Sequence, residues 1–545
     1  MAGIWIPGVE VIAGVDGGAF VGAPWRGVLH TTQGPTADGA ISTFQGNNFW
    51  PHFTVDFNAA RIVQHLSLDV AARALEVHTV QTNRANCVQL ELVGFAADTP
   101  SWSSDQIEFI GDLMRAIEAR VPIPRQSTVL FKTSPQADTL NNGVRLSAND
   151  WLAYSGWCGH QHVPENVHGD PGLIDIGYLC SPHLLGVGST QSSPGPAAVP
   201  RTPYVLDVAY ARGNSPYAEG WSSAWDGVST QVGDGNHAPA TAAGVALTAR
   251  HYDVLDAFWV TEQNNLFTSF WTRAQGWSTT EAQIGDPSVT ASTAGGIAAL
   301  ARQPDILDVF FVGLDNRLHT TWWTADQGWS PTTLLIGGPQ AIDATGGVSA
   351  VNRARDVIDV FAVGQDALLY TTWWTENGGW NNGSIAIAGQ SVPVNPVSGV
   401  AALARRPNNL DVIYIGDDAN LYAVSWSPST GWVNPTAIGG PVAPAANKVA
   451  GVAVVSRRPD VIDVFWIGQD KRLHTTWWTD ATGWNPGSLQ IGDPAIDLSG
   501  VATPAAVARQ ETILDVFVAD ENGNVLTVWW TQAGGWNPAY LTLDL

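Results

Sequence analysis

Histidine and aspartate are concentrated in one short segment of the chain, Gly159 to Gly172, with the sequence GHQHVPENVHGDPG. Imidazole nitrogen together with carboxylate oxygen is a ligand set suited to zinc, and a catalytic zinc site keeps one position open for water. His160 and Asp170 can supply two ligands across this loop, and His30, which closes an expected strand, can supply a third. These residue types predict a zinc site with hydrolytic chemistry.

Two other histidines are candidates at such a site, His162 as an alternative metal ligand and His168 as a group that assists catalysis. In an extended strand His162 would share a face with the first histidine of the segment, which makes it a rival ligand that we rank below Asp170. His168, as imidazolium or as a neutral donor, could stabilise an oxyanion. A lone histidine on a strand is more often an ordinary surface or core residue, and we expect this of His65 and His78.

The elements that must position these residues are short strands and helices. Apolar runs and alternations predict strands at 27–31, 52–57, 62–66 and 87–93. Ser103 and Gln106 form a capping-box pattern that opens a helix. Shorter helices are expected at about 68–78 and 148–154. Residues 1–185 are therefore predicted to form one α/β domain, a mixed sheet with flanking helices.

Residues 20–180 resemble the zinc-dependent N-acetylmuramoyl-L-alanine amidases of type 2, a family that includes phage endolysins and peptidoglycan-recognition proteins. The resemblance is carried, in order, by Val28-Leu-His30-Thr-Thr, Pro51-His52-Phe-Thr-Val-Asp, Gln89-Leu-Glu91-Leu-Val-Gly and the segment from Gly159-His160 to Asp170-Pro-Gly. It implies that His30, His160 and Asp170 bind Zn²⁺ and that Glu91 is the catalytic acid/base.

Strand parity agrees with the role of Glu91, because the residue alternates with Val88 and Leu90 and so points away from their apolar face. Two positions depart from the family pattern. Pro51 stands where many members have Tyr, and His168 stands where many have Lys. His168 remains the expected oxyanion partner.

The second half of the chain is repetitive. The segment Ile306-Leu-Asp-Val-Phe-Phe-Val-Gly returns with small changes, each time followed by a strand with Trp-Trp and a Gly-Trp turn. The repeats are anchored by Asp207, Asp256, Asp308, Asp359, Asp411, Asp463 and Asp515. A period of roughly 50 residues with four strand candidates per unit is typical of a β-propeller, here with seven blades. In the third unit the strands are expected at 296–301, 307–312, 318–324 and 333–336.

This region, about residues 197–545, resembles the seven-bladed propeller lectins of the Photorhabdus type. The resemblance implies carbohydrate binding at aromatic inter-blade clefts, although large aromatic residues also dominate cores, and at least one Trp of each pair should pack between blades. The Trp-Trp pair is missing from the first unit, and Ser425-Trp426 replaces it in the fifth. These two blades are expected to be the poorest sites, and the residues that bind glycans stay unassigned.

Composition limits the partners. The net charge of −24 disfavours nucleic acid and anionic lipid, and the sequence has no apolar stretch long enough to predict a transmembrane segment. The N-terminus lacks the features of a classical signal peptide, so extracellular or cell-wall-directed action would need another route, such as lysis, phage-like or injection-type delivery. Cys158 and Cys180 could pair in an oxidising compartment, but buried free thiols are at least as expected.

These observations predict an amidase-like zinc hydrolase domain at 1–185, a Gly/Ser/Pro-rich linker at 186–203 and a lectin-like propeller at 204–545. The expected function is hydrolysis of the bond between N-acetylmuramic acid and L-alanine, with Zn²⁺ as cofactor. Peptidoglycan would be the substrate and neutral cell-surface glycans the partners. Two alternatives stay open, a non-catalytic peptidoglycan- and glycan-binding protein and a toxin-like lectin.

Overall fold

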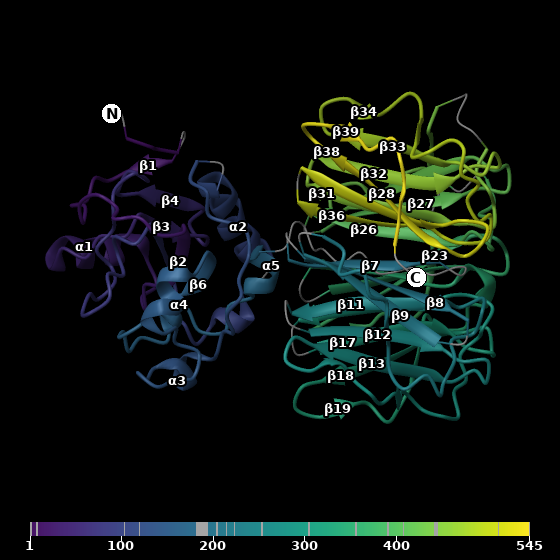
Figure 1. The fold of residues 1–545 in the computed structure, drawn as a ribbon, viewed down its shortest axis with the longest axis horizontal. Coiled ribbons are helices and arrows are strands. Elements are labelled where there is room, and N and C mark those ends of the chain that lie inside the picture. Colours follow the sequence, from purple (N-terminus) through teal and green to yellow (C-terminus); the bar gives the residue numbers. More distant parts are fainter. Residues whose placement is uncertain are drawn as a thin grey trace. The chain divides into compact units, whose positions relative to one another are not determined.

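The computed structural model describes residues 3–6, 9–102, 104–118, 120–180, 195–202, 205–213, 215–222, 224–251, 254–303, 306–354, 357–387, 389, 392–406, 408–440, 445–510 and 512–543. The chain forms two compact units, Met1–Ser181 and Pro182–Leu545. Each unit has its own sheets and its own buried core (Figure 1). Ser103, the expected helix cap, lies outside the described residues.

The first unit is built on one six-stranded sheet. In spatial order its strands are β1 (Glu10–Val11), β4 (Arg61–Gln64), β3 (Phe53–Asp56), β5 (Cys87–Leu92), β2 (Arg26–Thr31) and β6 (Gly156–Gly159). Neighbouring strands are parallel except for the antiparallel pair β3 and β4, so the sheet is mixed. The central strands β2 and β5 are buried along their whole length, as is typical of a sheet covered on both faces.

Helices pack against both faces of this sheet. The apolar residues of α2 (Ser104–Glu118) and α5 (Ile176–Cys180) share a core with Leu29 and Leu90. On the other face, Val28 packs with Trp151 of α4 (Ala148–Ala153). Because side chains alternate along a strand, the residues that follow Leu29 and Leu90 stand on the α4 face. The other helical elements described in this unit are α1 (Ala37–Asn47), α3 (Ser134–Ala137), η1 (Thr99–Ser101) and η2 (His160–His162).

The helix predicted at about 68–78 is wrong. This segment is irregular, and its backbone groups bond to other parts of the chain. The N–H of Arg73 donates to the carbonyl of Trp50 at 2.8 Å. The side chain of Asn83 bonds both the N–H and the carbonyl of Leu75. A helix over residues 68–78 would need these N–H and carbonyl groups for its own hydrogen bonds. Tertiary contacts therefore override the local helical preference of this segment.

The sequence analysis missed α1 but correctly placed α4. Thr36 caps α1, because its side chain accepts a hydrogen bond from the N–H of Gly39 at 3.3 Å. The helix ends at Asn48, which adopts the left-handed conformation with φ of 58°. Threonine before a helix and asparagine after it are known end signals, so this helix was detectable.

The second unit is a seven-bladed propeller, as predicted: it holds seven antiparallel sheets in sequence order, one with four strands and six with five. The innermost strands are β7 (Ala197–Thr202), β11 (Val245–His251), β16 (Ala298–Gln303), β21 (Ser349–Ala354), β26 (Val400–Arg406), β31 (Val452–Arg458) and β36 (Ala505–Gln510). Each innermost strand packs against the innermost strand of the next blade, and β36 packs against β7. The seven blades therefore close into a ring.

Two further strands complete the regular part of each blade. The second strands are β8 (Val205–Arg212), β12 (Val254–Val260), β17 (Ile306–Val312), β22 (Val357–Val363), β27 (Asn409–Ile415), β32 (Val461–Ile467) and β37 (Ile513–Ala519). The third strands are β9 (Ser215–Trp221), β13 (Leu266–Thr272), β18 (Leu318–Thr324), β23 (Leu369–Thr375), β28 (Leu421–Ser427), β33 (Leu473–Thr479) and β38 (Val525–Thr531). The strands predicted for the third unit at 307–312 and 318–324 agree with β17 and β18 to within one residue.

In blades 2 to 7 the described outer edge is split into two short strands that both pair with the third strand, where the sequence predicted one, while blade 1 has the single outer strand β10. These strands are β10 (Thr230–Gln231), β14 (Gly276–Trp277), β15 (Ala282–Gln283), β19 (Gly328–Trp329), β20 (Leu334–Ile336), β24 (Gly379–Trp380), β25 (Ile385–Ala386), β29 (Gly431–Trp432), β30 (Thr436–Ile438), β34 (Gly483–Trp484), β35 (Leu489–Ile491), β39 (Gly535–Trp536) and β40 (Leu541–Thr542). The first residue of the Gly-Trp turn has a positive φ, 75° at Gly328, which explains the glycine. A 3₁₀ turn, η3 (Ala344–Gly346), precedes β21.

The linker predicted at 186–203 extends too far toward the C-terminus. Residues 197–202 form β7, the innermost strand of blade 1, and pair with β8. Alternating apolar residues in Ala197-Ala-Val-Pro give this strand its buried face, which the Gly, Ser and Pro content had concealed. Residues 186–194 of the predicted linker lie outside the described residues.

Candidate functional site

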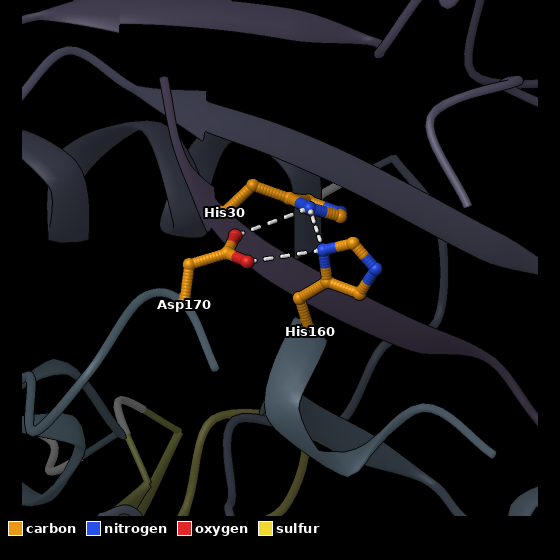
Figure 2. Close-up of side chains that lie close together, drawn as sticks. All are labelled: His30, His160 and Asp170. Carbon is orange, nitrogen blue, oxygen red and sulfur yellow. Dashed lines mark hydrogen bonds and ion pairs between the residues drawn. The ribbon is translucent and has the colours of Figure 1, made fainter. Parts of the chain in front are cut away.

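The three residues predicted as metal ligands lie together at the carboxyl end of β2. His30 is the fifth residue of that strand, His160 follows the end of β6 and opens η2, and Asp170 lies in the loop after η2. Since β2 and β6 are parallel neighbours, their carboxyl ends meet at one edge of the sheet, where ligands commonly bind in such folds. Figure 2 shows the three side chains pointing toward one another.

The geometry of this cluster fits a tetrahedral metal ion. The Nδ1 atoms of His30 and His160 are 3.1 Å apart, and the carboxylate of Asp170 lies 3.1 Å from His160 Nδ1 and 3.5 Å from His30 Nδ1. Ligand atoms about 2.0–2.1 Å from a tetrahedral zinc are separated by roughly 3.3 Å. All three side chains are buried. Two imidazole nitrogens and one carboxylate oxygen are a donor set that suits Zn²⁺.

The electrostatics keep two of these groups in their metal-binding forms. Burial, together with the neighbouring His160, lowers the pKa of His30 to about 4, so its imidazole is neutral at pH 7. Burial acts to raise the pKa of Asp170, but His160 and His30 outweigh it and the pKa is lowered. For His160 burial acts to lower the pKa, and Asp170 reverses this, so the pKa is raised. Neutral imidazole and ionised carboxylate are the forms that bind a metal.

Glu91 and His168, the two predicted catalytic residues, both border the cluster. Glu91 is the register partner of His30 on β5, and its carboxylate lies 4.0 Å from His30 Nδ1. Burial and, secondarily, the charge of Asp170 raise the pKa of Glu91 to about 8. His168 is exposed, and its ring stacks on that of His160 with the centroids 4.8 Å apart.

His162 does not join the cluster. Residues 160–162 form a 3₁₀ turn, so the expectation of a shared strand face with His160 is wrong. The Nδ1 atom of His162 accepts the N–H of Gly159 at 2.9 Å, and its Nε2 lies 2.9 Å from the carbonyl of Leu130. Both ring nitrogens of His162 therefore contact backbone groups. His65 is buried and bonded to Thr54 and to the carbonyl of Ile12, and His78 is exposed.

Two residues that the sequence analysis did not single out hold this loop. Asn166 is fully buried, and its Oδ1 lies 2.9 Å from Nε2 of His160. Arg145 donates to the carbonyl of Val163 at 2.9 Å and to that of Thr139 at 2.9 Å. Neither belongs to a recognisable motif.

The cysteines Cys87, Cys158 and Cys180 are all buried free thiols.

In the propeller, the anchoring aspartates belong to a contact that recurs at all seven blade junctions. Each aspartate is buried and forms an ion pair with the arginine six residues before it. The guanidinium then covers a tryptophan of the next blade, with Cζ 3.9–4.5 Å from the ring centroid. We call this arrangement the inter-blade staple. Its seven arginine–tryptophan contacts are Arg201–Trp271, Arg250–Trp323, Arg302–Trp374, Arg353–Trp426, Arg405–Trp478, Arg457–Trp530 and Arg509–Trp221.

The two tryptophans of a pair face different neighbours. Trp323 receives Arg250 from the preceding blade. Trp322 lies directly opposite Asp308 across the β17–β18 pair, so Trp322 and Asp308 lie on the same face of the blade. On this face Arg302 pairs with Asp308 and covers Trp374 of the following blade. Trp322 and Trp323 are both half buried, and Trp323 also packs against the core that blades 2 and 3 share. This confirms that one tryptophan of each pair packs between blades. The first tryptophan has no ring or cation–π contact among the described residues, and we call it the accessible tryptophan.

The tryptophan of each Gly-Trp turn also packs between blades. Trp329 meets the edge of Phe258 of the preceding blade with ring centroids 5.8 Å apart, and Trp380 meets Phe310 at 5.9 Å.

Four junctions carry the accessible tryptophan of the preceding blade, at Trp322, Trp373, Trp477 and Trp529.

At the remaining three junctions the accessible position holds Gly220, Phe270 or Ser425, each opposite its aspartate. The Ser425 hydroxyl donates to Asp411 at 2.6 Å. Blades 1 and 5 therefore lack the accessible aromatic but keep the staple.

One arginine edge remains available beside the accessible ring. Arg302 bonds Asp308 through Nε and Nη2. Within the described residues, its Nη1 has no hydrogen-bond acceptor. The junction between blades 3 and 4 thus combines a half-buried indole with a guanidinium donor.

A second group with potential metal ligands, Asp234, His237 and Glu281, lies in the propeller. Here Glu281 accepts the backbone N–H groups of Gly235 and His237 and the imidazole of His237, at 2.7–3.1 Å. These bonds explain the group as a support for the 233–237 loop. No helix among the described residues is long and apolar enough to cross a membrane.

Comparison with known proteins bears on the propeller. No family model and no curated protein matches the chain. Among solved structures, the BP39L lectin from Burkholderia pseudomallei is 26% identical with a TM-score of 0.57, over 65% of this chain and 99% of the lectin. A fungal lectin with a six-bladed propeller, from Aleuria aurantia, is 15% identical with a TM-score of 0.37, over 66% of this chain and 98% of that one. The second unit is accordingly a lectin-like seven-bladed β-propeller.

Proposed function

We propose that the chain is a glycan-binding protein that recognises neutral sugars at its blade junctions. The observation that supports this most is the half-buried tryptophan beside an arginine that pairs with a buried aspartate, at four junctions of a lectin-like ring. An indole face can stack on the apolar C–H face of a sugar, and the arginine can donate to its hydroxyl groups. The net charge of −24 disfavours anionic glycans. Among neutral sugars, fucose or methylated hexoses are the expected ligands, partly because of the resemblance to propeller lectins.

Binding of the full-length protein to a glycan array tests this proposal. Trp322→Ser gives one junction the residue that Ser425 supplies at another, so it should weaken binding to the array sugars. Leu335→Ser is the matched control, because this side chain is half exposed on the outer strand β20 of the same blade. Equal binding by both variants and the parent would remove Trp322 from the site, and no binding by the parent would end the proposal.

A second function is favoured for the first unit by the buried cluster of His30, His160 and Asp170. We propose that these residues hold Zn²⁺ and that the unit hydrolyses the amide bond between N-acetylmuramic acid and L-alanine in peptidoglycan. When bound, zinc would supply Lewis-acid polarisation of the carbonyl and would acidify a water molecule. Both glycan and peptidoglycan lie outside the cytoplasm, so we expect the protein to act extracellularly or at a cell wall.

The chain's own residues would move the protons in this reaction. Glu91 would take a proton from the attacking water and pass it to the leaving amine, because its carboxylate borders the cluster. His168, exposed and stacked on His160, would donate a hydrogen bond to the tetrahedral oxyanion. Asp170, held by the N–H of Thr31 at 3.2 Å, would keep its position through the cycle.

A non-catalytic recognition protein is the alternative, and it agrees better with the comparisons, in which the similar structures are lectins. Metal analysis of the full-length protein, combined with release of soluble fragments from purified peptidoglycan, separates the two. Zinc with release supports the hydrolase. Peptidoglycan binding without release, with or without zinc, supports the recognition protein.

A further inference from the structure

The two imidazoles of the metal cluster are held in different ways. His160 directs Nδ1 into the cluster, while its Nε2 lies 2.9 Å from Oδ1 of Asn166. His30 also directs Nδ1 into the cluster, but its buried Nε2 has no partner among the described residues. A second hydrogen bond on a metal-binding imidazole fixes both the ring orientation and the nitrogen that carries the proton.

The amide of Asn166 has only one orientation that satisfies its surroundings. Its Oδ1 accepts the N–H of Glu76 at 3.1 Å, and its Nδ2 donates to the carbonyls of Pro164 at 2.9 Å and Glu76 at 3.3 Å. An amide oxygen can only accept, so Nε2 of His160 must be the donor in their contact. The neutral imidazole then carries its proton on Nε2 and its lone pair on Nδ1, which faces His30 and Asp170.

We propose that Asn166 is a positioning residue for the metal centre, which sets the tautomer and ring orientation of His160 and thereby the zinc affinity. The proposal rests on the zinc site proposed above. It also makes the segment around Glu76, which is remote in sequence, part of the support of the centre, because this backbone fixes the amide of Asn166. Asn166 itself contacts neither His30 nor Asp170 in any hydrogen bond described, so it acts through His160.

The chain offers a close control for this residue. Asn83 is also buried, and it bonds the N–H and the carbonyl of Leu75 just as Asn166 bonds those of Glu76. Asn83 also accepts a hydrogen bond from the side-chain amide of Gln89, and among the described residues it bonds no proposed metal ligand. Asn83→Ala therefore loosens the same stretch of backbone without altering His160.

The experiment measures zinc affinity of the full-length protein by competition with a chromogenic chelator. Asn166→Ala, and Asn166→Leu as a variant of similar volume, should lower the affinity about 10–100-fold. Asn166→Asp should restore part of it, since one carboxylate oxygen also accepts the Nε2 proton of His160, while the other cannot donate to the carbonyls of Pro164 and Glu76. Asn83→Ala should bind zinc as tightly as the parent. Thermal unfolding of each zinc-free variant checks that it is folded. If only one of Asn166→Ala and Asn166→Leu is folded, the zinc affinity of that variant is compared with the parent's.

The outcomes distinguish this inference from the proposed function. If the parent binds zinc and neither Asn166→Ala nor Asn166→Leu loses affinity, the positioning role is wrong while the zinc site stands. If Asn83→Ala loses as much affinity as Asn166→Ala, the effect comes from the backbone segment and the role of Asn166 is overturned. A parent that binds no zinc would refute the metal site itself and this inference with it.

Discussion

Two buried histidines of the first unit, His30 and His162, have different roles, and the groups that their ring nitrogens face decide which. His30 is buried with its pKa lowered to about 4, and it turns Nδ1 toward a carboxylate. His162 is buried with a pKa also near 4, but both of its nitrogens meet backbone groups. A neutral imidazole is thus necessary for metal binding and not sufficient. The free nitrogen must also converge with other ligands.

The first prediction separates the ligands from the rival histidine. His30→Ala or Asp170→Ala should remove zinc from the purified protein, because each leaves only two of the three protein ligands. His162→Ala should keep zinc and instead lower the stability by about 1–3 kcal/mol, the cost of leaving buried polar groups without partners. Metal content and urea unfolding are the measurements. Loss of zinc in His162→Ala together with its retention in Asp170→Ala would reverse the assignment.

The second prediction concerns Glu91. Glu91→Gln should bind zinc normally and lose about 10²–10⁴-fold in the rate of fragment release from peptidoglycan, since the amide cannot transfer the proton. His78→Gln, at an exposed position away from the cluster, should keep the parent rate. A loss of less than roughly tenfold in Glu91→Gln would leave this carboxylate without a role in proton transfer.

The convergence of His30, His160 and Asp170 could be predicted at this scale, and the residues that support them could not. His30, His160 and Asp170 stand in stretches with a recognisable order and spacing, so residue types alone indicated them. Asn166 gives no such signal, because its partner Glu76 is 90 residues away and meets it only through the fold. The exposed position of His168 and the backbone contacts of Arg145 likewise depend on how the loop closes.

At the scale of elements, the repeat determines the blades because each unit supplies its own strands. The spacing of the aspartates was enough to predict seven blades, but not why aspartate is there. The explanation was visible in the sequence, since an arginine stands six residues before every anchoring aspartate. What the sequence cannot display is that each guanidinium covers a tryptophan of the next blade, about 70 residues further on or across the ring closure. The same limit applies to the wrongly predicted helix at 68–78, whose backbone bonds elsewhere.

The third prediction tests the inter-blade staple. Asp463→Ala should destabilise the propeller by about 3–5 kcal/mol, because it removes the buried carboxylate that pairs with the guanidinium of Arg457, whose side chain is only 17% exposed. Asp326→Ala is the control, since this residue is exposed and surface substitutions typically change stability by about 0.5 kcal/mol or less. Urea unfolding monitored by tryptophan fluorescence measures both. A loss of stability no larger than the control's would show that the staple contributes little.

At the scale of the whole molecule, the chain joins two units with separate cores. The candidate metal cluster draws all its residues from the first unit, and every junction draws its residues from the second. We therefore expect the two activities to be separable. Adding a zinc chelator to the full-length protein should stop peptidoglycan hydrolysis and leave glycan binding unchanged. Parallel loss of both activities would mean that the junctions depend on the metal.

The most direct test of the glycan-binding proposal is the stoichiometry of the full-length protein with a neutral monosaccharide, measured by titration calorimetry. We predict about four equivalent sites, one at each of Trp322, Trp373, Trp477 and Trp529, and the loss of one site in Trp322→Ser. Leu335→Ser should keep all four. A single site, or a stoichiometry that replacing these tryptophans does not change, would contradict the claim that the half-buried tryptophans form the sugar sites.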